Sequence, residues 1–448
     1  MASLAAMLKT KGYEVYGSDK GVYPPMSDFL AQQYIPVFEG FDPAHLTPAP
    51  DLVVVGNVIS RGNVEIEEIL DRHIPYISLP DALREFLIRG KRSIVVTGTH
   101  GKTTTTSLLA WMFHVADRHP NFMVGGIPKN FARGFQLDAG DAFILEGDEY
   151  DSAFFDKVAK FLRYLPDIGI ISSIEFDHAD IYNSLDDIKL AFRRFVNLIP
   201  RSGLLVVNQD DPNVMDVVQH AFCPVVTFGN STQAEWRAED VQVQHSQTQF
   251  DVYFHNEFWG RATSAFPGAH NIRNTLSAIA VAAFAGIDTE RILEAISTFQ
   301  GVKRRLELKG TVRGIEVYDD FAHHPTAVKE TLAALRAQHP RQRLWALYEP
   351  RSATSRRNIF QHEFVDAFGE ADVVLVAPVH RPDKAPPDQR FSSQTLAKDL
   401  QAQGKISHHL KVDDMVNYVA QHAKEGDIIV TFSNGPFGGI HTKLLNSF

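Results

Sequence analysis

The sequence predicts an α/β protein built on parallel sheets, and three observations support that prediction. Short apolar runs alternate with helix-like segments along most of the 448 residues. One apolar run, residues 93–97, leads directly into the loop Gly98-Thr-His-Gly-Lys-Thr103, which is typical of a phosphate-binding turn between a strand and a helix. The length suits about three domains of ordinary size. We therefore expect three alternating blocks, over residues 1–89, 90–300 and 301–448.

Composition excludes several classes of protein. Hydrophobic residues make up 44% and charged residues 22%, and the formal net charge is −10. We expect a soluble globular protein without a nucleic-acid partner, because no basic cluster stands out. No apolar run approaches the roughly 20 residues of a membrane helix, so we expect no membrane insertion. The single cysteine, Cys223, lies in an apolar run and is expected in the core. It suits a reducing compartment, and we expect a cytoplasmic monomer.

The first block opens on a helix-like pattern of Leu4, Met7 and Leu8. Strands are expected next at Glu14–Tyr16, Asp51–Asn57 and Ile74–Ser78. A Rossmann-type unit places a strand and a Gly-rich turn before its first helix. Neither is present here, so we expect the first strand of this block to be missing from the sequence.

The loop that opens the second block has the form GxxGKT rather than the full Walker pattern, because Val96 occupies the position of the first glycine. Gly98 and Gly101 allow backbone N–H groups to close around phosphate oxygens, and the following helix directs its positive end at them. Lys102 supplies a mobile cation, and Thr103 offers a hydroxyl to Mg²⁺. The alternative is a chance GKT in an ordinary strand–helix turn, which the flanking pattern disfavours.

Two further strands of this block end in acidic residues. They deliver two groups: Glu146, Asp148, Glu149 and Asp151, then Glu175, Asp177, His178 and Asp180. In a parallel sheet both groups would lie near the phosphate loop, where hard oxygen ligands suit Mg²⁺. One such group alone would more often be a solvated loop; two on neighbouring strands favour a functional site.

Later segments of the sequence carry polar residues that could have either functional or structural roles. The residues concerned are His270, Asn271 and Asn274, Arg304 and Arg305, Asp319, Asp320, His323 and His324, and Arg351, Arg356 and Arg357. An asparagine amide can read an adenine edge, although Asn271 could equally cap a helix. The paired histidines lack a third ligand at zinc spacing, so we expect no zinc site. The last arginines could read a carboxylate or phosphate or could form a solvated face.

Taken in order, the segments GTHGKTTTT, EGDEYD, EFDHAD, PGAHNIRN, GVKRRLE and DDFAHHPTA resemble the Mur ligase superfamily over nearly the whole chain. The resemblance implies Rossmann-like N- and C-terminal domains around a central P-loop ATPase-like parallel sheet. It assigns residues 1–89 to a UDP-sugar, 90–300 to ATP and 301–448 to an incoming amine. It also implies an ATP-dependent carboxylate–amine ligase that forms ADP and phosphate.

Other segments are most similar to the branch that acts on UDP-N-acetylmuramate: GSDKGVYPPMS, EGDEYDSAFFDK, EFDHADIY, EPRS and SNGPFGGIH. Within that branch the resemblance implies an acceptor tripeptide, L-alanyl-γ-D-glutamyl-meso-diaminopimelate, used in peptidoglycan recycling. The alternative is an L-alanine-adding ligase of peptidoglycan synthesis. Such ligases usually carry a histidine and then two arginines where this sequence has Arg351, Ser352 and Ser355, which favours a different acceptor.

The resemblance also implies roles for individual residues. ATP would contact Gly98, Thr99, His100, Gly101, Lys102, Thr103, Thr104, Asn274, Arg305, Asp320 and His323. Mg²⁺ would be held by Thr103, Glu146 and His178, and catalysis would depend on Lys102, His178 and Arg305. The sugar nucleotide and peptide would contact Ser18, Asp19, Asn57, His178 and Arg351. Several members of the superfamily carry a modified lysine about fourteen residues after the histidine of the DH motif; here that position is Phe192, so no carbamylated lysine is expected.

The chemistry implied is activation of a carboxylate as an acyl phosphate, followed by attack of an amine. Two anions must meet in the first step, so fixed positive charge is needed. Because Arg305, Asp320 and His323 belong to the third block, we expect the site to be complete only when the blocks close. Three other interpretations stay open: a P-loop switch or ATPase that forms no bond, a folate-type polyglutamate ligase, and a nicotinamide dehydrogenase. The motifs of the UDP-N-acetylmuramate branch disfavour the polyglutamate ligase. The dehydrogenase is disfavoured because the second and third blocks carry no hydride chemistry.

Overall fold

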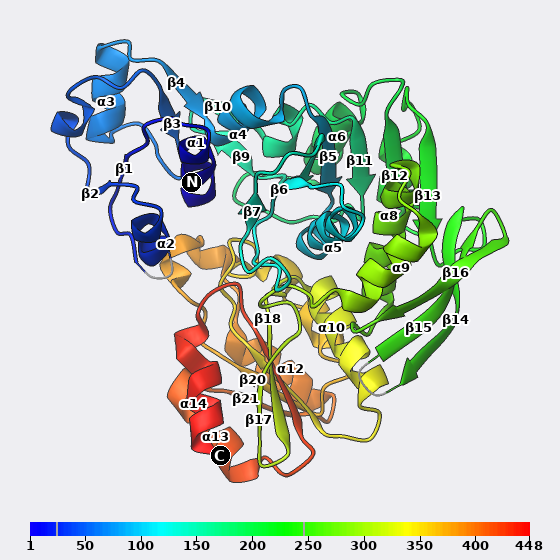
Figure 1. Cartoon of the computed structure of the whole chain (residues 1–448). Coiled ribbons are helices and arrows are strands. Elements are labelled where there is room, and N and C mark those ends of the chain that lie inside the picture. Colours follow the sequence, from blue (N-terminus) through cyan, green and yellow to red (C-terminus); the bar gives the residue numbers. More distant parts are fainter. Residues whose placement is uncertain (24–25, 245–246) are drawn as a thin grey trace.

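The structure is a computed structural model that describes residues 1–23, 26–244 and 247–448. Three blocks follow one another, with the first (blue) and central (cyan to green) blocks above the C-terminal block (yellow to red) in Figure 1. The mixed α/β architecture with several parallel sheets confirms the predicted fold class. Pro24 and Pro25 of the segment GSDKGVYPPMS lie outside the described residues.

The first block holds two separate parallel sheets of two strands each, β1–β2 and β3–β4. Its helices and strands are α1 (Ala2–Thr10), β1 (Gly17–Asp19), α2 (Met26–Gln32), β2 (Val37–Glu39), β3 (Val53–Val55), α3 (Val64–Asp71), β4 (Tyr76–Ser78) and α4 (Leu79–Leu83). The strand predicted at Glu14–Tyr16 begins instead at Gly17. Pairing with β2 starts there, where Gly17 faces Val37.

The central block is a ten-stranded sheet in the order β16-β15-β14-β13-β12-β11-β5-β8-β6-β7. The strands are β5 (Arg92–Thr97), β6 (Asn121–Met123), β7 (Phe135–Gln136), β8 (Ala142–Glu146), β11 (Ile168–Ile171), β12 (Leu204–Asn208), β13 (Val225–Gly229), β14 (Trp236–Gln244), β15 (Gln247–Phe254) and β16 (Glu257–Ser264). The helices are α5 (Lys102–Val115), α6 (Leu185–Val196), α7 (Pro212–Val217), α8 (Ala269–Phe284) and α9 (Thr289–Thr298). A small hairpin, β9 (Asp151–Ala153) and β10 (Asp156–Ala159), follows β8.

Alternate residues of β5 face two apolar layers, so both faces of the central sheet are covered. Ile94 and Val96 pack with α5, α8 and α9, and Val95 packs with α1, α4, α6 and α7. Cys223 belongs to the second layer, which confirms its predicted burial. Such continuous apolar strands are expected where a parallel sheet is buried on both faces.

The strand register brings the predicted functional loops to one edge of this sheet. β5 pairs in parallel with β8 on one side, where Val96 faces Glu146, and with β11 on the other, where Thr97 faces Ile171. Gly98, Gly147 and Ser172 therefore follow their strands at neighbouring points. The phosphate loop and both acidic groups leave the sheet side by side, as parallel strands require.

Strands β14, β15 and β16 form an antiparallel extension that the sequence analysis did not predict. Their polar and apolar residues alternate, because only one face is buried: Phe250 and Val252 of β15 are covered while Gln247 is exposed. The extension lies at the edge of the sheet away from β7 (Figure 1).

The C-terminal block is a six-stranded sheet in the order β17-β18-β22-β19-β20-β21, parallel except for β17. Its elements are β17 (Glu307–Val312), β18 (Ile315–Asp320), α10 (Pro325–Gln338), β19 (Leu344–Tyr348), α11 (Glu363–Ala367), β20 (Val373–Val376), α12 (Ser393–Ala402), β21 (Ile406–His409), α13 (Val412–His422), β22 (Ile428–Phe432) and α14 (Ile440–Ser447). Helices α10 to α12 cover one face and α13 and α14 the other. Within the described ranges, no helix is both long and apolar enough to cross a membrane.

Candidate active site

A cavity of about 750 Å³ lies where the central and C-terminal blocks meet. Its walls include every residue predicted to contact ATP except Gly98, together with Glu146 and His178. Arg305, Asp320 and His323 of the C-terminal block therefore share one cavity with the phosphate loop. The structure brings together residues that lie more than 200 positions apart in the sequence.

The phosphate loop takes its shape from two glycines with positive φ. Gly98 has φ +124°, and a Cβ there would lie 2.2 Å from the Ser172 hydroxyl and 2.9 Å from the Ser172 amide nitrogen. Gly101 has φ +83°, and a Cβ there would lie 2.2 Å from Oδ1 of Asn274. Helix α5 begins at Lys102 without a side-chain cap, so the amides of its first turn remain available to an anion.

Lys102 lies at the centre of the loop and is mostly buried. Its Nζ is 2.7 Å from Oε2 and 3.0 Å from Oε1 of Glu149, and it donates to the Gly98 carbonyl at 2.6 Å. Burial alone would lower the pKa of Lys102, but the charge of Glu149 outweighs it and raises the pKa. The lysine is therefore a fixed cation beside the loop.

The Thr103 side chain connects the phosphate loop to Glu146 at the end of β8 and to Arg305 of the C-terminal block. Its hydroxyl donates to Oε1 of Glu146 at 2.8 Å and accepts from the Arg305 guanidinium at 3.0 Å. The other oxygen of Glu146 accepts from the Gly125 amide at 2.7 Å. Arg305 stacks over Phe321, with 4.9 Å from its guanidinium carbon to the ring centroid. The Thr103 and Glu146 oxygens are hard donors held side by side, and this donor set suits Mg²⁺.

His178 lies on the other side of Glu149. Its Nε2 is 3.3 Å from Oε1 of Glu149, and donor atoms of Asp148, Glu149 and His178 all lie within 4.8 Å of one another. Burial alone would lower the pKa of His178, but the hydrogen bond to Glu149 and the charges of Glu149 and Asp177 raise the pKa to about 9. In the absence of a metal, the imidazole is therefore held as a cation.

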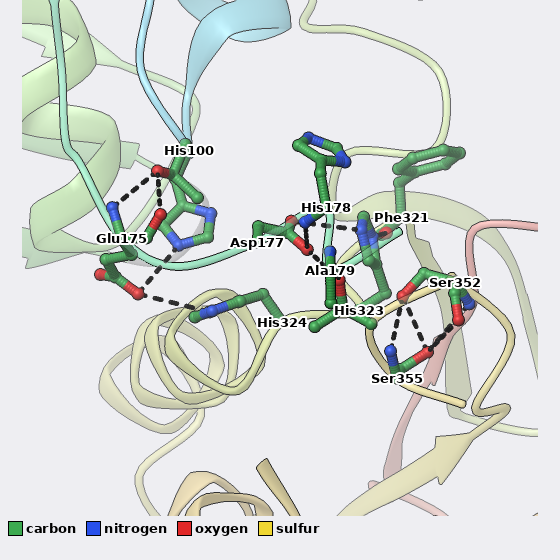
Figure 2. A network of polar contacts seen from close by, with 12 residues as sticks. His100, Glu175, Asp177, His178, Ala179, Phe321, His323, His324, Ser352 and Ser355 are labelled. Atoms are coloured by element: carbon green, nitrogen blue, oxygen red, sulfur yellow. Dashed lines mark hydrogen bonds and ion pairs between the residues drawn. The ribbon is translucent and has the colours of Figure 1, made fainter. Parts of the chain in front are cut away.

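The C-terminal block packs against the loop that carries His178 through buried hydrogen bonds (Figure 2). The Thr354 hydroxyl donates to Oδ1 of Asp177 at 2.6 Å and accepts from the Ala179 amide at 3.3 Å. Arg357 donates to the Ala179 carbonyl at 2.8 Å. These contacts place the C-terminal block directly over the acidic group that follows β11.

Asp320 and His323 belong to the loop that follows β18. The Asp320 carboxylate accepts from the amides of Leu306 and Ala322 at 2.6 and 2.8 Å, while burial raises its pKa. His323 Nδ1 lies 3.1 Å from the Phe321 carbonyl, and burial lowers the pKa of the imidazole. Asp320 thus orients the turn that presents Arg305 on one side and His323 on the other.

Four predicted substrate residues do not line this cavity, among the residues described. They are Ser18, Asp19, Asn57 and Arg351. Ser18 and Asp19 lie on β1 and Asn57 just after β3, and the Ser18 hydroxyl donates to Glu65. Arg351 lies in the C-terminal block, where its Nη1 is 3.7 Å from Oε1 of Glu349; a Cβ on Gly435 would lie 2.1 Å from its Nε.

The structure decides one alternative that the sequence left open, and it shows one contact that the sequence did not predict. Gly268, not Asn271, caps α8, and the Asn271 amide donates to the Pro267 carbonyl at 2.8 Å. The sequence analysis did not select Thr354, although this residue lies between Arg351 and Arg356. Only the docking of two distant segments identifies it. Phe192 is fully buried and packs on Phe161 with ring centroids 5.2 Å apart, so a core aromatic fills the position of the modified lysine.

Three family models match successive parts of the chain. They are described as Mur ligase family, catalytic domain (residues 1–91), Mur ligase middle domain (96–282) and Mur ligase, glutamate ligase domain (304–435).

Individual relatives match over almost the whole length. The UDP-N-acetylmuramate–L-alanyl-γ-D-glutamyl-meso-2,6-diaminoheptandioate ligase of Escherichia coli is 38% identical over 449 residues, with 100% of this chain and 95% of the relative covered. A UDP-N-acetylmuramate–L-alanine ligase of Salinibacter ruber is 34% identical, covering 97% and 90%. The crystal structure of a murein peptide ligase from Psychrobacter arcticus superposes with a TM-score of 0.72 at 36% identity, covering 100% and 96%.

Proposed function

This chain belongs to the Mur ligase family, and on that premise we propose that it joins L-alanyl-γ-D-glutamyl-meso-diaminopimelate to the lactyl carboxylate of UDP-N-acetylmuramate. ATP drives the reaction, and ADP and phosphate leave. The observation that carries the proposal is the 38% identity, over the full length, to a ligase of that name. An assembled cavity around the GxxGKT loop supports it, because such a site is what carboxylate activation needs.

The reaction divides into two balanced steps. A carboxylate oxygen of UDP-N-acetylmuramate attacks the γ-phosphorus of ATP, and the bond to the β-phosphate oxygen breaks, releasing ADP. The amine of the tripeptide then attacks the acyl carbon, phosphate leaves with the bonding electrons, and the nitrogen loses a proton. Phosphate is a far better leaving group than oxide, which explains why ATP is consumed.

The chain's own cations oppose the charge that accumulates in the first step. Lys102 and Arg305 reach the same cavity from two different blocks, and the amides at the start of α5 add fixed dipoles. Both side chains are held before substrate arrives: Glu149 pairs with Lys102, and Phe321 stacks with Arg305. Closure of the C-terminal block over the cavity would exclude water, which would otherwise hydrolyse the acyl phosphate.

Thr103 and Glu146 would hold an ATP-linked Mg²⁺, and His178 would help to hold a second. When bound, Mg²⁺ supplies positive charge where the phosphates and the carboxylate meet. His178 binds a metal only through a lone pair, so its proton must first leave. Asn274 is proposed to read adenine, and Asp320 and His323 to contact the nucleotide.

The substrate assignments outside the cavity are also proposals. Ser18, Asp19 and Asn57 are assigned to the UDP-sugar in a domain of residues 1–89, beside an ATP domain of residues 90–300. Arg351 is assigned to a carboxylate of the peptide in a domain of residues 301–448. A quarter of the Arg351 side chain is exposed, and among the described residues Glu349 is the one carboxylate paired with it, so its guanidinium can still bind a second anion.

The test is a product analysis with two acceptors. The chain is incubated with Mg-ATP and UDP-N-acetylmuramate, together with either the tripeptide or free L-alanine, and the product is identified by mass. We expect the tripeptide adduct and phosphate release that requires both partners. If a product forms with L-alanine and not with the tripeptide, the alternative function is favoured, that of a UDP-N-acetylmuramate–L-alanine ligase such as the Salinibacter ruber relative. Phosphate release without either partner would indicate an ATPase that forms no bond.

A further inference from the structure

A second group of metal-ligating side chains lies beside the phosphate loop, and none of its members is assigned to Mg²⁺ binding or to catalysis, although His100 is also a predicted ATP contact. His100 of the loop, Glu175 after β11 and His324 at the start of α10 converge on one point (Figure 2). One ligand atom from each lies within 4.8 Å of the other two. The three residues come from three segments, two in the central block and one in the C-terminal block.

One carboxylate oxygen is the centre of this group. Oε2 of Glu175 lies 3.4 Å from Nε2 of His100 and 3.4 Å from Nδ1 of His324. It also accepts the Thr326 hydroxyl at 2.7 Å, which fixes the orientation of the carboxylate. The rings of His100 and His324 lie with centroids 4.8 Å apart on the same side of it.

The hydrogen bonds of His324 determine which of its nitrogens carries a lone pair toward this point. Nε2 lies 3.3 Å from the Phe176 carbonyl, which can only accept, so Nε2 carries the proton. Nδ1 accepts from the Thr326 amide at 3.3 Å, as the N-cap of α10. The one lone pair of a neutral His324 is therefore at Nδ1, 3.4 Å from Oε2 of Glu175, and a metal ion bound there would replace the Thr326 amide as the partner of Nδ1.

A ring N–H bonded to a backbone carbonyl is also the usual support of a metal-bound histidine. Two imidazoles and one carboxylate form a donor set that suits Zn²⁺ and Co²⁺ better than Mg²⁺. The group borders the cavity, which leaves room for a solvent ligand. We propose that His100, Glu175 and His324 form a binding site for a divalent transition metal that ties the phosphate loop to the C-terminal block.

Binding at this site would have a structural consequence. A metal held by all three residues joins His100 and Glu175 of the central block to His324 of the C-terminal block, so it favours the arrangement in which the blocks are in contact. Because the metal binds the assembled site and not the separated blocks, it raises the unfolding temperature of the chain.

The test uses Co²⁺ as a spectroscopic probe of the full chain, treated with a chelator and kept free of nucleotide. We expect visible absorption typical of four-coordinate Co²⁺, reversed by Zn²⁺, and a higher unfolding temperature with either metal. Glu175→Gln keeps the shape of the side chain, and His324→Asn keeps an N-cap acceptor, so both variants should fold. Each is expected to bind Co²⁺ at least about tenfold more weakly.

Two control variants locate the metal. His119→Ala removes an exposed histidine that does not belong to the group, and this variant should bind Co²⁺ as the unchanged chain does. His178→Ala removes a ligand of the other cluster, Asp148, Glu149 and His178, and should retain the Co²⁺ spectrum. The proposal is overturned if the unchanged chain shows no such spectrum, if the spectrum survives in both Glu175→Gln and His324→Asn, or if only His178→Ala removes it.

Discussion

The Nζ of Lys102 lies 2.7 Å from Oε2 of Glu149, and only 3% of the Glu149 side chain is exposed. A buried carboxylate thus holds the cation of the phosphate loop in place before any nucleotide is present. The pair keeps Lys102 charged, since Glu149 raises the pKa of the lysine and Lys102 lowers that of the glutamate. A substrate phosphate must compete with Glu149 for the same ammonium group.

Lys102→Ala is therefore expected to abolish amide formation while sparing the binding of UDP-N-acetylmuramate. Removing the cation leaves the developing phosphate charge unopposed, and we expect kcat/KM to fall at least about a thousandfold. Coupled measurement of ADP release and direct titration of the sugar nucleotide report the two effects separately. Lys157→Ala is the matched control, because Lys157 is also ion-paired, to Asp151 at 2.5 Å, but is largely exposed. Near-normal turnover in Lys102→Ala would show that this loop is not the ATP site.

Gly98→Ala tests whether the loop needs its glycine for space as well as for backbone freedom. A Cβ at residue 98 would overlap the Ser172 hydroxyl and crowd two backbone amides, so the loop must move. Gly404→Ala is the control: φ is +81° there, but nothing lies within 4 Å of the added atom. We expect Gly404→Ala to cost about 1 kcal/mol in free energy of unfolding, measured by urea unfolding.

For Gly98→Ala we expect a greater loss of stability, by about 1–3 kcal/mol, and weaker ATP binding by calorimetry. Equal costs for the two variants would mean that the contact with Ser172 relaxes freely and that only φ matters.

The sequence predicted much of the central sheet and its loops, because local signals determine them. Apolar runs predicted the buried strands, and Gly98 to Thr103 marked the glycine turn between β5 and α5. The parallel connection of β5, β8 and β11 then followed from strand–helix alternation, which is why Glu146 and His178 could be placed near the loop.

Features that depend on distant segments could not be predicted in the same way. The Thr354 hydroxyl bonds to Asp177 across 177 positions, and no local pattern marks a threonine for that contact. The antiparallel extension of β14 to β16 was also missed, because alternating polar residues such as those of β15 weaken the apolar signal. The roles of all the predicted site residues remain predictions, and Ser18, Asp19, Asn57 and Arg351 do not line the cavity.

Thr354→Val should weaken the contact between the C-terminal block and the loop of His178. Valine keeps the volume but leaves Oδ1 of Asp177 and the Ala179 amide without their partner in a buried place. We expect a loss of about 1–3 kcal/mol in the free energy of unfolding. We also expect a higher KM for ATP, because residues of both blocks line the proposed nucleotide site. Thr354→Ser retains the hydroxyl and should restore most of both values. If valine keeps both values and serine loses them, the methyl packing matters and the hydrogen bond does not.

His178 predicts a pH dependence of stability in the chelator-treated, nucleotide-free chain. Its pKa is about 9 in the folded chain against about 6.5 when unfolded, because Glu149 and Asp177 favour the imidazolium although burial and Lys102 oppose it. The folded state therefore binds a proton more tightly than the unfolded state. The resulting stabilisation is complete below pH 6.5 and is lost as the pH rises through 9. Its size should be on the order of 3 kcal/mol.

Urea unfolding at pH 6 to 9.5, compared between the unchanged chain and His178→Gln, measures this term directly. Glutamine can still hydrogen-bond to Glu149 but cannot carry the charge, so the difference in stability should be greatest near pH 6 and shrink toward pH 9.5. A difference that stays constant across this range would mean that the imidazole is neutral in the folded chain, and that Glu149 is balanced by Lys102 alone. In that case a metal could bind His178 without first displacing a proton, and the competition between metal and proton expected here would be absent.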